Sequence, residues 1–279
     1  IVYDVDVMAG KLNDYDWLHL HHEDFTGQYG KFYANFGLEP WYLEQKHFHE
    51  EMAAELGFET VWKLKHAVAA TIRDYVQGGG FLFAMCSATD TIDIALAWLA
   101  TDIVPAPFDN TPYDPGFRTK VDYEGTFAFQ DFKLTTNPMI YEFSDIDTSN
   151  YAMMRGAMAD YFTLFAFAAK YDPVPAMLTQ NHVNVINGFL GQTTGYSRKH
   201  LKRAAIVLAA VEGTDEVKYI HGKRGMGPWT FLGGHDPEDY QHRVGDPPTD
   251  LDLYPTSPGY RLILNNVLFP AARKKPQKT

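Results

Sequence analysis

The only cysteine of the chain, Cys86, follows a short apolar run and precedes a segment with helical periodicity. Residues 78–80 are glycines, and the run Phe81–Met85 is too short for a helix, so the pattern predicts a strand, a tight turn and a helix. Small residues, Ala84 and Ala88, stand two positions before and after the cysteine, as a sharp nucleophile elbow requires. A thiol there lies at a helix N-terminus, where free N–H groups favour the thiolate. The alternative is a buried structural cysteine.

The second residue suited to acid–base chemistry is His235, which follows two glycines near the C-terminus. A Gly-Gly pair lets the backbone approach a pocket closely, and an imidazole can serve as the base for a thiol. Either Asp236 or Glu238 could orient this imidazole. The alternative for His235 is a hydrogen-bonding role in a turn.

A cluster of histidines and acids ends the strand that we expect at residues 16–22. Alternation along a strand places His19 and His21 on one face and allows at most one of His21 and His22 to reach a shared cleft. With Glu23 and His235, His19 and His21 are the weak candidates for a zinc site. Since no other zinc-type spacing occurs, we predict no metal and no cofactor, and we expect hydrogen-bonding or substrate-binding roles at His19, His21 and Glu23.

Two segments carry a family resemblance. The run from Tyr75 to Cys86, after the strand-like residues 15–21, resembles the core of the class I glutamine amidotransferase-like superfamily, and residues 233–236 resemble its ThuA-like branch, named for trehalose utilisation. As a whole, the chain most resembles bacterial proteins labelled asparagine synthetase B, although it lacks an N-terminal cysteine and a Ser-Gly-Gly-x-Asp-Ser loop. The resemblance implies an open, mostly parallel, flavodoxin-like α/β sheet flanked by helices.

The resemblance also implies a site. Loop 25–31 stands where amidotransferases form an oxyanion hole with a Gly-Gly pair, and here Thr26 and Gly27 take that place. With Ser87, they complete the predicted substrate-binding residues. The amidotransferase signature is His-Pro-Glu, whereas here one residue, Asp236, intervenes between His235 and the Pro-Glu pair. Because both features depart from the pattern, we expect no glutaminase activity.

Charge and composition narrow the possible partners. The chain has 24 Lys and Arg against 35 Asp and Glu, a net charge of −11, and no basic stripe, which argues against nucleic acid. No apolar run approaches the roughly 18 residues of a transmembrane helix. A single cysteine excludes an internal disulfide and leaves the compartment open between cytoplasmic and exported. The oligomeric state is open as well.

The chain reads as one domain over residues 1–279. Residues 1–7 alternate like a strand, and the resemblance makes this the second strand of the sheet, with the first upstream. Four prolines and short β-like segments, among them 126–129, 139–143, 161–168 and 182–190, predict an irregular, β-rich insertion at about 105–200.

Two functions remain open. In the first, a hydrolase or transferase, Cys86 attacks a carbonyl or amide carbon, His235 acts as base and then acid, and elbow N–H groups hold the oxyanion. In the second, a catalytically silent module binds a carbohydrate or another small polar ligand in the same cleft. The first predicts that Cys86 reacts with iodoacetamide faster than a model thiol.

Overall fold

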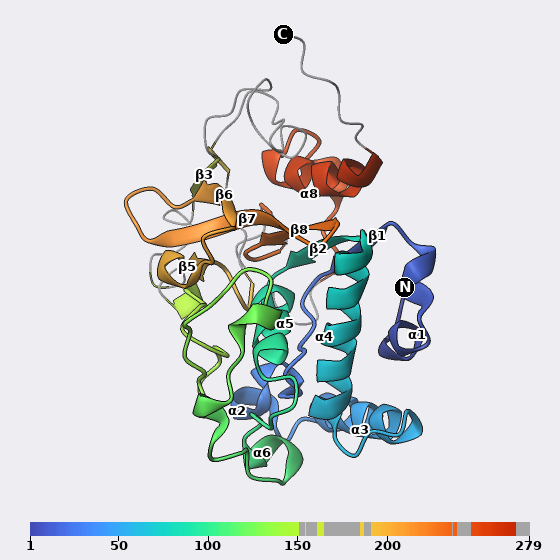
Figure 1. Ribbon diagram of the computed structural model, residues 1–279. Helices are drawn as coiled ribbons and strands as arrows, with labels where there is room; N and C mark the ends of the chain where they lie inside the picture. Colours follow the sequence, from blue (N-terminus) through green and yellow to red (C-terminus); the bar gives the residue numbers. More distant parts are fainter. Residues whose placement is uncertain are drawn as a thin grey trace.

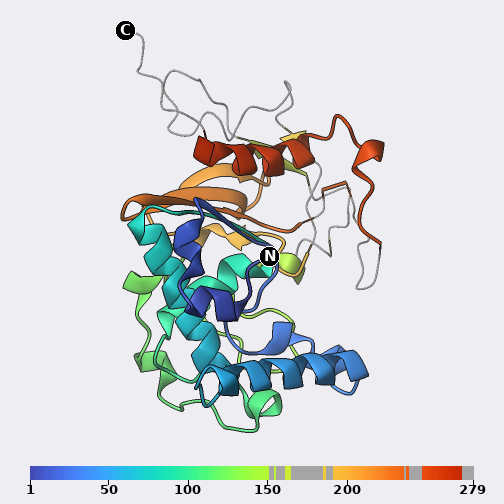
Figure 2. The same cartoon turned by 90° about the vertical axis from the view of Figure 1, so that its right-hand side faces the viewer.

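An open sheet with helices on both faces organises the molecule (Figures 1 and 2). The computed structural model describes residues 1–150, 154, 161–164, 185–186, 191–235, 237–238 and 247–271. The described strands run in the order β1-β2-β8-β7-β6-β3-β4, and β5 pairs with β7. Their bounds are β1 Trp17–Leu20, β2 Phe81–Met85, β3 Phe162–Leu164, β4 Val185–Ile186, β5 Tyr196–Ser197, β6 Ile206–Ala210, β7 Glu216–Arg224 and β8 Gly227–Leu232.

The sheet is mixed. Strands β1, β2 and β8 are parallel, whereas β8, β7, β6, β3 and β4 pair in antiparallel fashion. The expected parallel sheet is therefore confined to three of the described strands. The change of direction comes from the β7–β8 hairpin, which the sequence predicts and whose two-residue turn holds Gly225 at φ +58°.

The helices surround the sheet unequally. Helix α8 covers one face, and α4 and α5 cover the other (Figure 1). The helical spacing of Leu64, Val68 and Ile72 predicts a helix over residues 62–77, which α4 confirms. Ser257-Pro258 predicts the start of a last helix, and in α8 Ser257 accepts a hydrogen bond from the Tyr260 N–H. The helix bounds are α1 Asp4–Met8, α2 Tyr33–Phe36, α3 Pro40–Glu55, α4 Val61–Gly78, α5 Ser87–Ala97, α6 Ala106–Asp109 and α8 Pro258–Leu268.

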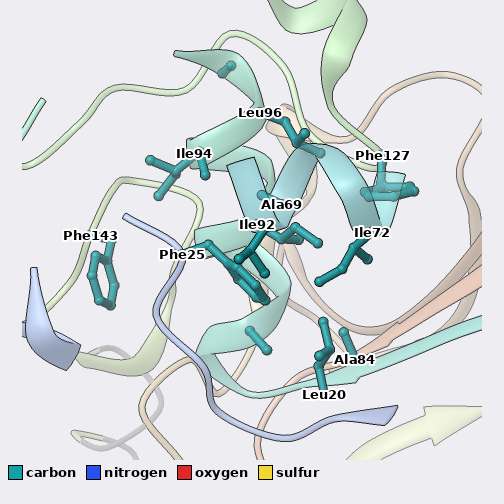
Figure 3. Close-up of a cluster of buried hydrophobic side chains, with 14 of the residues drawn as sticks. Leu20, Phe25, Ala69, Ile72, Ala84, Ile92, Ile94, Leu96, Phe127 and Phe143 are labelled. Atoms are coloured by element: carbon teal, nitrogen blue, oxygen red, sulfur yellow. The ribbon is translucent and has the colours of Figure 1, made fainter. Parts of the chain in front are cut away.

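Strand β2 is buried on both faces and joins two cores. Leu82 and Ala84 belong to the larger cluster, on the side of α4 and α5, whereas Phe81, Phe83 and Met85 belong to the cluster that includes Leu262 of α8. Figure 3 shows part of the larger cluster, where Leu20 and Ala84 lie beside Ile72 and Ile92. A strand that is buried on both faces has apolar residues at every position, and this unbroken apolar run made β2 predictable from the sequence.

Three expected strands are wrong, and the contacts of two of them show why. Residues 4–8 form helix α1, because the Asp6 carboxylate accepts a hydrogen bond from the Tyr3 N–H at 3.0 Å and so caps the first turn, while Asp4 pairs with Lys65 of α4 at 2.5 Å. Residues 126–129 form no strand either, because the Asp93 carboxylate binds three of their backbone N–H groups.

The middle of the chain is more irregular than expected. Residues 139–143 also lie outside the strands, and the described part of 106–149 consists of short helical turns and loops joined by isolated bridges. Strands β3 and β4 fall within the expected segments 161–168 and 182–190. Among the described residues, no helix is long and apolar enough to cross a membrane.

Candidate functional site

Cys86 stands between β2 and α5 in a conformation that L-residues rarely adopt. Its φ is 52° and its ψ is −139°, and it forms the N-cap of α5. Three hydrogen bonds hold it: its N–H donates to the Leu232 carbonyl at 3.1 Å, and its carbonyl accepts from the N–H and the hydroxyl of Thr89 at 3.1 and 2.6 Å. The predicted strand-to-helix elbow is confirmed. Such strain persists only where the surroundings fix it, and it is concentrated at functional sites.

Residues 191–195, which we call the strap, cross over the thiol. The Gln192 N–H donates a hydrogen bond to Cys86 Sγ at 3.1 Å. The Gln192 side chain donates to the Gly30 carbonyl at 2.6 Å, and the Gln192 carbonyl accepts from the Ser149 hydroxyl at 2.7 Å. Cys86 is 0% exposed. The backbone of the strap therefore forms a polar part of the cover over this buried thiol.

The strap also brings Cys86 and His235 together. A Cβ at Gly191 would lie 2.8 Å from Cys86 Sγ and 2.9 Å from Cδ2 of His235. Both distances are shorter than Cβ contacts in real proteins, so only glycine fits between the two side chains. The Gly234 N–H donates to the Thr193 carbonyl at 2.7 Å and fixes the turn that carries His235 against the strap.

The histidine cluster gathers beside His235. The ring centroid of His235 is 4.9 Å from that of His21 and 5.8 Å from that of His22. The expectation that only one of these two neighbours reaches the cleft is wrong, because β1 ends at Leu20 and strand alternation stops there. His19 packs on Phe83 at 5.0 Å, and burial lowers its pKa to about 4.

These imidazoles do not form a metal site in the part of the chain that the structure describes. No group of three or more His, Cys, Asp or Glu side chains among those residues is placed to hold an ion. The zinc alternative for His19, His21, Glu23 and His235 therefore has no geometric support.

A pocket of about 490 Å³ opens next to the histidines. Glu23, which lies in its wall, is exposed to solvent. Gly30 also lines it and connects it to the strap through the carbonyl that binds Gln192. The lining residues are His21, His22, Glu23, Asp24, Gly27, Tyr29, Gly30, Phe32, Trp41, Gln45, His49, Val61 and Lys65.

A second pocket, of about 360 Å³, lies at the opposite ends of the strands. It is lined by the glycines 78–80 and by Asn13, Tyr15 and Asp16. In open α/β sheets, ligands bind at the carboxyl ends of the parallel strands, where Cys86, His21 and His235 lie. The first pocket is therefore the better candidate for a substrate.

The predicted oxyanion loop is used differently from what the resemblance implies. The N–H and hydroxyl of Thr26 both donate to Asp24 Oδ1, at 2.7 and 2.6 Å. Gly27 packs against Trp62, where a Cβ would approach within 2.8 Å, and it lines the first pocket. Thr26 therefore holds its own loop together.

The remaining predicted residues lie around the elbow and the last helix. Ser87 is buried, and within the described residues its hydroxyl has no hydrogen-bond partner. Asp236 lies outside the described residues. Glu238 accepts a hydrogen bond from the Ser257 hydroxyl at 2.7 Å, which joins the turn after His235 to the N-terminus of α8.

Sequence reasoning missed two acids behind the strap, the fully buried Asp90 and the half-buried Asp147. The Thr193 hydroxyl donates to Asp90 Oδ1 at 2.8 Å, and Ser149 donates to Asp147 Oδ1 through its N–H at 2.7 Å. Burial raises the pKa of Asp90 to about 7, and burial together with the charge of Asp90 raises the pKa of Asp147. In the sequence, the one signal for this pair is that Asp90 lies about one helical turn after Cys86.

Comparisons with known proteins leave the family open. No family model matches the chain, and no curated protein matches it. Among solved structures, it is similar to the cytoplasmic protein STM3548 of Salmonella typhimurium, with a TM-score of 0.41, 10% identity, and coverage of 95% of this chain and 77% of that one. It is also similar to the cytoplasmic protein STM1381 of Salmonella typhimurium LT2, with a TM-score of 0.36, 12% identity, and coverage of 83% and 65%.

Proposed function

We propose that the protein is a cysteine-dependent hydrolase or transferase that acts on a small polar carbonyl or amide substrate. The Cys86 sulfur attacks the carbonyl carbon, and His235 accepts the thiol proton and later returns it to the leaving group. Asp236 or Glu238 orients the imidazole. We also propose that the sheet is flavodoxin-like and that the protein is related to the glutamine amidotransferase-like superfamily and its ThuA-like branch.

The observation that carries this proposal is that Cys86 Sγ and His235 Cδ2 both lie within 3 Å of the point where a Cβ at Gly191 would stand. A structural cysteine needs neither a left-handed backbone nor an imidazole across a glycine. Here both occur at one strand-to-helix elbow, and α5 begins directly after the cysteine. This combination supports a nucleophile–base pair.

The adjoining pocket supports a substrate without a negative charge. Glu23 and Asp24 line it, and its one lysine, Lys65, is paired with Asp4 at 2.5 Å. Phe32 and Trp41 add apolar ring surface. A free amino acid such as glutamine would bring a carboxylate next to these acids, so we retain the expectation that glutaminase activity is absent.

The test is acylation by p-nitrophenyl acetate, a small ester that reports any activated thiol. We expect one acetyl group per chain, located on Cys86 by peptide mass spectrometry and absent in Cys86→Ala. The same reagent applied to the protein unfolded in urea gives the rate for an ordinary thiol. A folded protein whose Cys86 is acetylated more slowly than in the unfolded chain would contradict the proposal.

Complete burial of Cys86 favours a second candidate function, a catalytically silent binding module. The thiol is 0% exposed, which also works against the fast iodoacetamide reaction expected from the sequence. In this case the pocket binds a neutral carbohydrate or another small polar ligand through its histidines and aromatic rings. Thermal-shift measurements of Cys86→Ala with a panel of neutral sugars would then show stabilisation that is lost in Trp41→Ala.

A further inference from the structure

An acyl-transfer site at Cys86 needs hydrogen-bond donors for the oxyanion, and the elbow supplies one of them. Ser87 is the first residue of α5, so its N–H has no acceptor within the helix. In nucleophile elbows, the N–H after the nucleophile pairs with a second N–H from a separate loop. The remaining question is which segment gives the second donor.

Loop 25–31 has few donors to spare. The N–H groups of Thr26 and Gly30 donate to the Asp24 carboxylate, at 2.7 and 2.9 Å. The N–H of Gln28 donates to the Thr26 hydroxyl at 3.3 Å, and the N–H of Lys31 donates to the Gln28 carbonyl at 3.0 Å. Since these four groups already have acceptors, the loop is a poor source for the second donor.

We propose that the backbone N–H of Gln192 is the second oxyanion donor. This N–H already reaches Cys86 Sγ at 3.1 Å. When the sulfur bonds to a carbonyl carbon, the carbonyl oxygen lies only one bond beyond that carbon, within reach of the same N–H. The donor therefore passes from the sulfur, which loses its negative charge when the new bond forms, to the oxygen on which charge develops.

The strap holds this donor in place before any substrate binds. The Gln192 side chain donates to the Gly30 carbonyl at 2.6 Å, and Ser149 binds the strap on both sides of Thr193, at the Gln192 carbonyl and the Thr194 N–H. Thr193 adds its hydrogen bond to Asp90. An oxyanion donor that is fixed in advance needs no reorganisation during the reaction, which is the condition for a large effect on rate.

The inference rests on the proposed function, and its chemical step balances without a further reactant. The Cys86 sulfur forms a bond to the carbonyl carbon, the C=O π pair moves onto the oxygen, and the thiol proton passes to His235. When the tetrahedral species collapses, the π bond re-forms, the bond to the leaving group breaks and His235 returns the proton to that group. Only the oxyanion stage uses the N–H groups of Ser87 and Gln192.

The experiment compares two reactions at the same sulfur. p-Nitrophenyl acetate reacts through a tetrahedral oxyanion, whereas iodoacetamide reacts by direct displacement at an sp³ carbon and forms none. Gln192→Pro removes the N–H itself, and Gln192→Leu keeps the N–H but loses the side-chain bond to Gly30. Gln77→Leu, at an exposed glutamine of α4, is the matched control.

We expect acetylation of Cys86 to slow by about 10²–10³-fold in Gln192→Pro and by roughly tenfold in Gln192→Leu, because one oxyanion donor is lost or loosened. Alkylation should not slow in either variant, and Gln77→Leu should match the parent protein in both reactions. Circular dichroism checks folding, and Gln192→Leu decides the matter if Gln192→Pro does not fold.

Two results would overturn the assignment. Acetylation and alkylation that slow in parallel would show that the strap only controls access to the thiol. Acetylation that is unchanged in the variants would place the donor elsewhere, while Cys86 stays the nucleophile. If Cys86 of the parent protein is not acetylated at all, the proposed function itself fails, which is a separate outcome.

Discussion

Helix α5 carries two fully buried aspartates, Asp90 and Asp93, and their surroundings differ sharply. Asp93 accepts hydrogen bonds from the N–H groups of Phe127, Ala128 and Phe129 at 2.6, 2.7 and 2.9 Å, so both of its oxygens are occupied. Asp90 accepts one hydrogen bond, from Thr193, and in the part of the chain that the structure describes its second oxygen has no partner.

The difference separates a structural acid from one that belongs to the site. Asp93 fixes the 126–129 segment to α5 through three of its backbone N–H groups, so it acts on the fold. Asp90 holds the strap over Cys86 and interacts with a second, half-buried acid, Asp147, which raises the cost of charging either one. The same residue type on one helix therefore has two roles that measurements can distinguish.

The largest expected loss of stability comes from substitution of the structural acid, Asp93. Asp93→Ala leaves three buried N–H groups without an acceptor, and we expect the free energy of unfolding at pH 7 to fall by roughly 3–5 kcal/mol. Asp93→Asn, which keeps one oxygen, should lose about half as much. Urea denaturation measures both. Asp90→Asn is the matched control, and a loss as large as that of Asp93→Ala would remove the distinction.

The second effect is expected at Gly191 of the strap, which Cys86 and His235 approach closely. In Gly191→Ala the new methyl group must push Cys86 and His235 apart, so we expect a loss of about 1–3 kcal/mol in unfolding free energy together with slower acetylation of Cys86. Gly78→Ala is the control, since a Cβ at that helical position meets nothing within 4 Å and alanine favours helices. If both variants behaved alike, the crowding at Gly191 would be disproved.

A third effect is a change of stability with pH. Burial raises the pKa of Asp90 from 3.8 to about 7, so folding takes up a proton between these values. The stability that Asp90 contributes is thus fully present below pH 3.8 and is lost as the pH rises through about 7. We expect the unfolding free energy of the parent protein, minus that of Asp90→Asn, to fall by up to about 1.4 kcal/mol per pH unit across this range.

The subtraction isolates this contribution. Histidines such as His66 and His221, whose pKa burial lowers to about 4, give the opposite slope at acidic pH, but they are present in both proteins and cancel. The shift at Asp147 has the same sign as that at Asp90 and should decrease in the variant, because part of it comes from the charge of Asp90. A difference that stays flat from pH 4 to 7 would refute the assignment.

Local signals explain what was predictable from the sequence. Helix α4, the β7–β8 hairpin and the elbow at Cys86 each follow from periodicity and turn residues within one short segment. Helix α1 was missed because the alternation of residues 1–7 fits a strand, while a cap at Asp6 and an ion pair with α4 favour a helix.

The contacts of the strap could not be predicted from such local signals. Gln192 meets Cys86 from 106 positions away, through a backbone N–H that leaves no mark in the sequence. The same holds for Asp147, whose role depends on the charge of Asp90 on another segment. Contacts of this kind depend on tertiary packing, and only the glycine at position 191 hinted at a close approach.

The central claim is that Cys86 and His235 work as one nucleophile–base pair, and the rate of Cys86 acetylation by p-nitrophenyl acetate at pH 7 tests it most directly. We expect His235→Asn to lower this rate by about 10²–10⁴-fold, the usual contribution of a general base. His19→Asn is the matched control, because His19 packs on Trp17 and Phe83 within the same cluster, and it should leave the rate unchanged. Equal rates in His235→Asn and the parent protein, with both folded, would contradict the account.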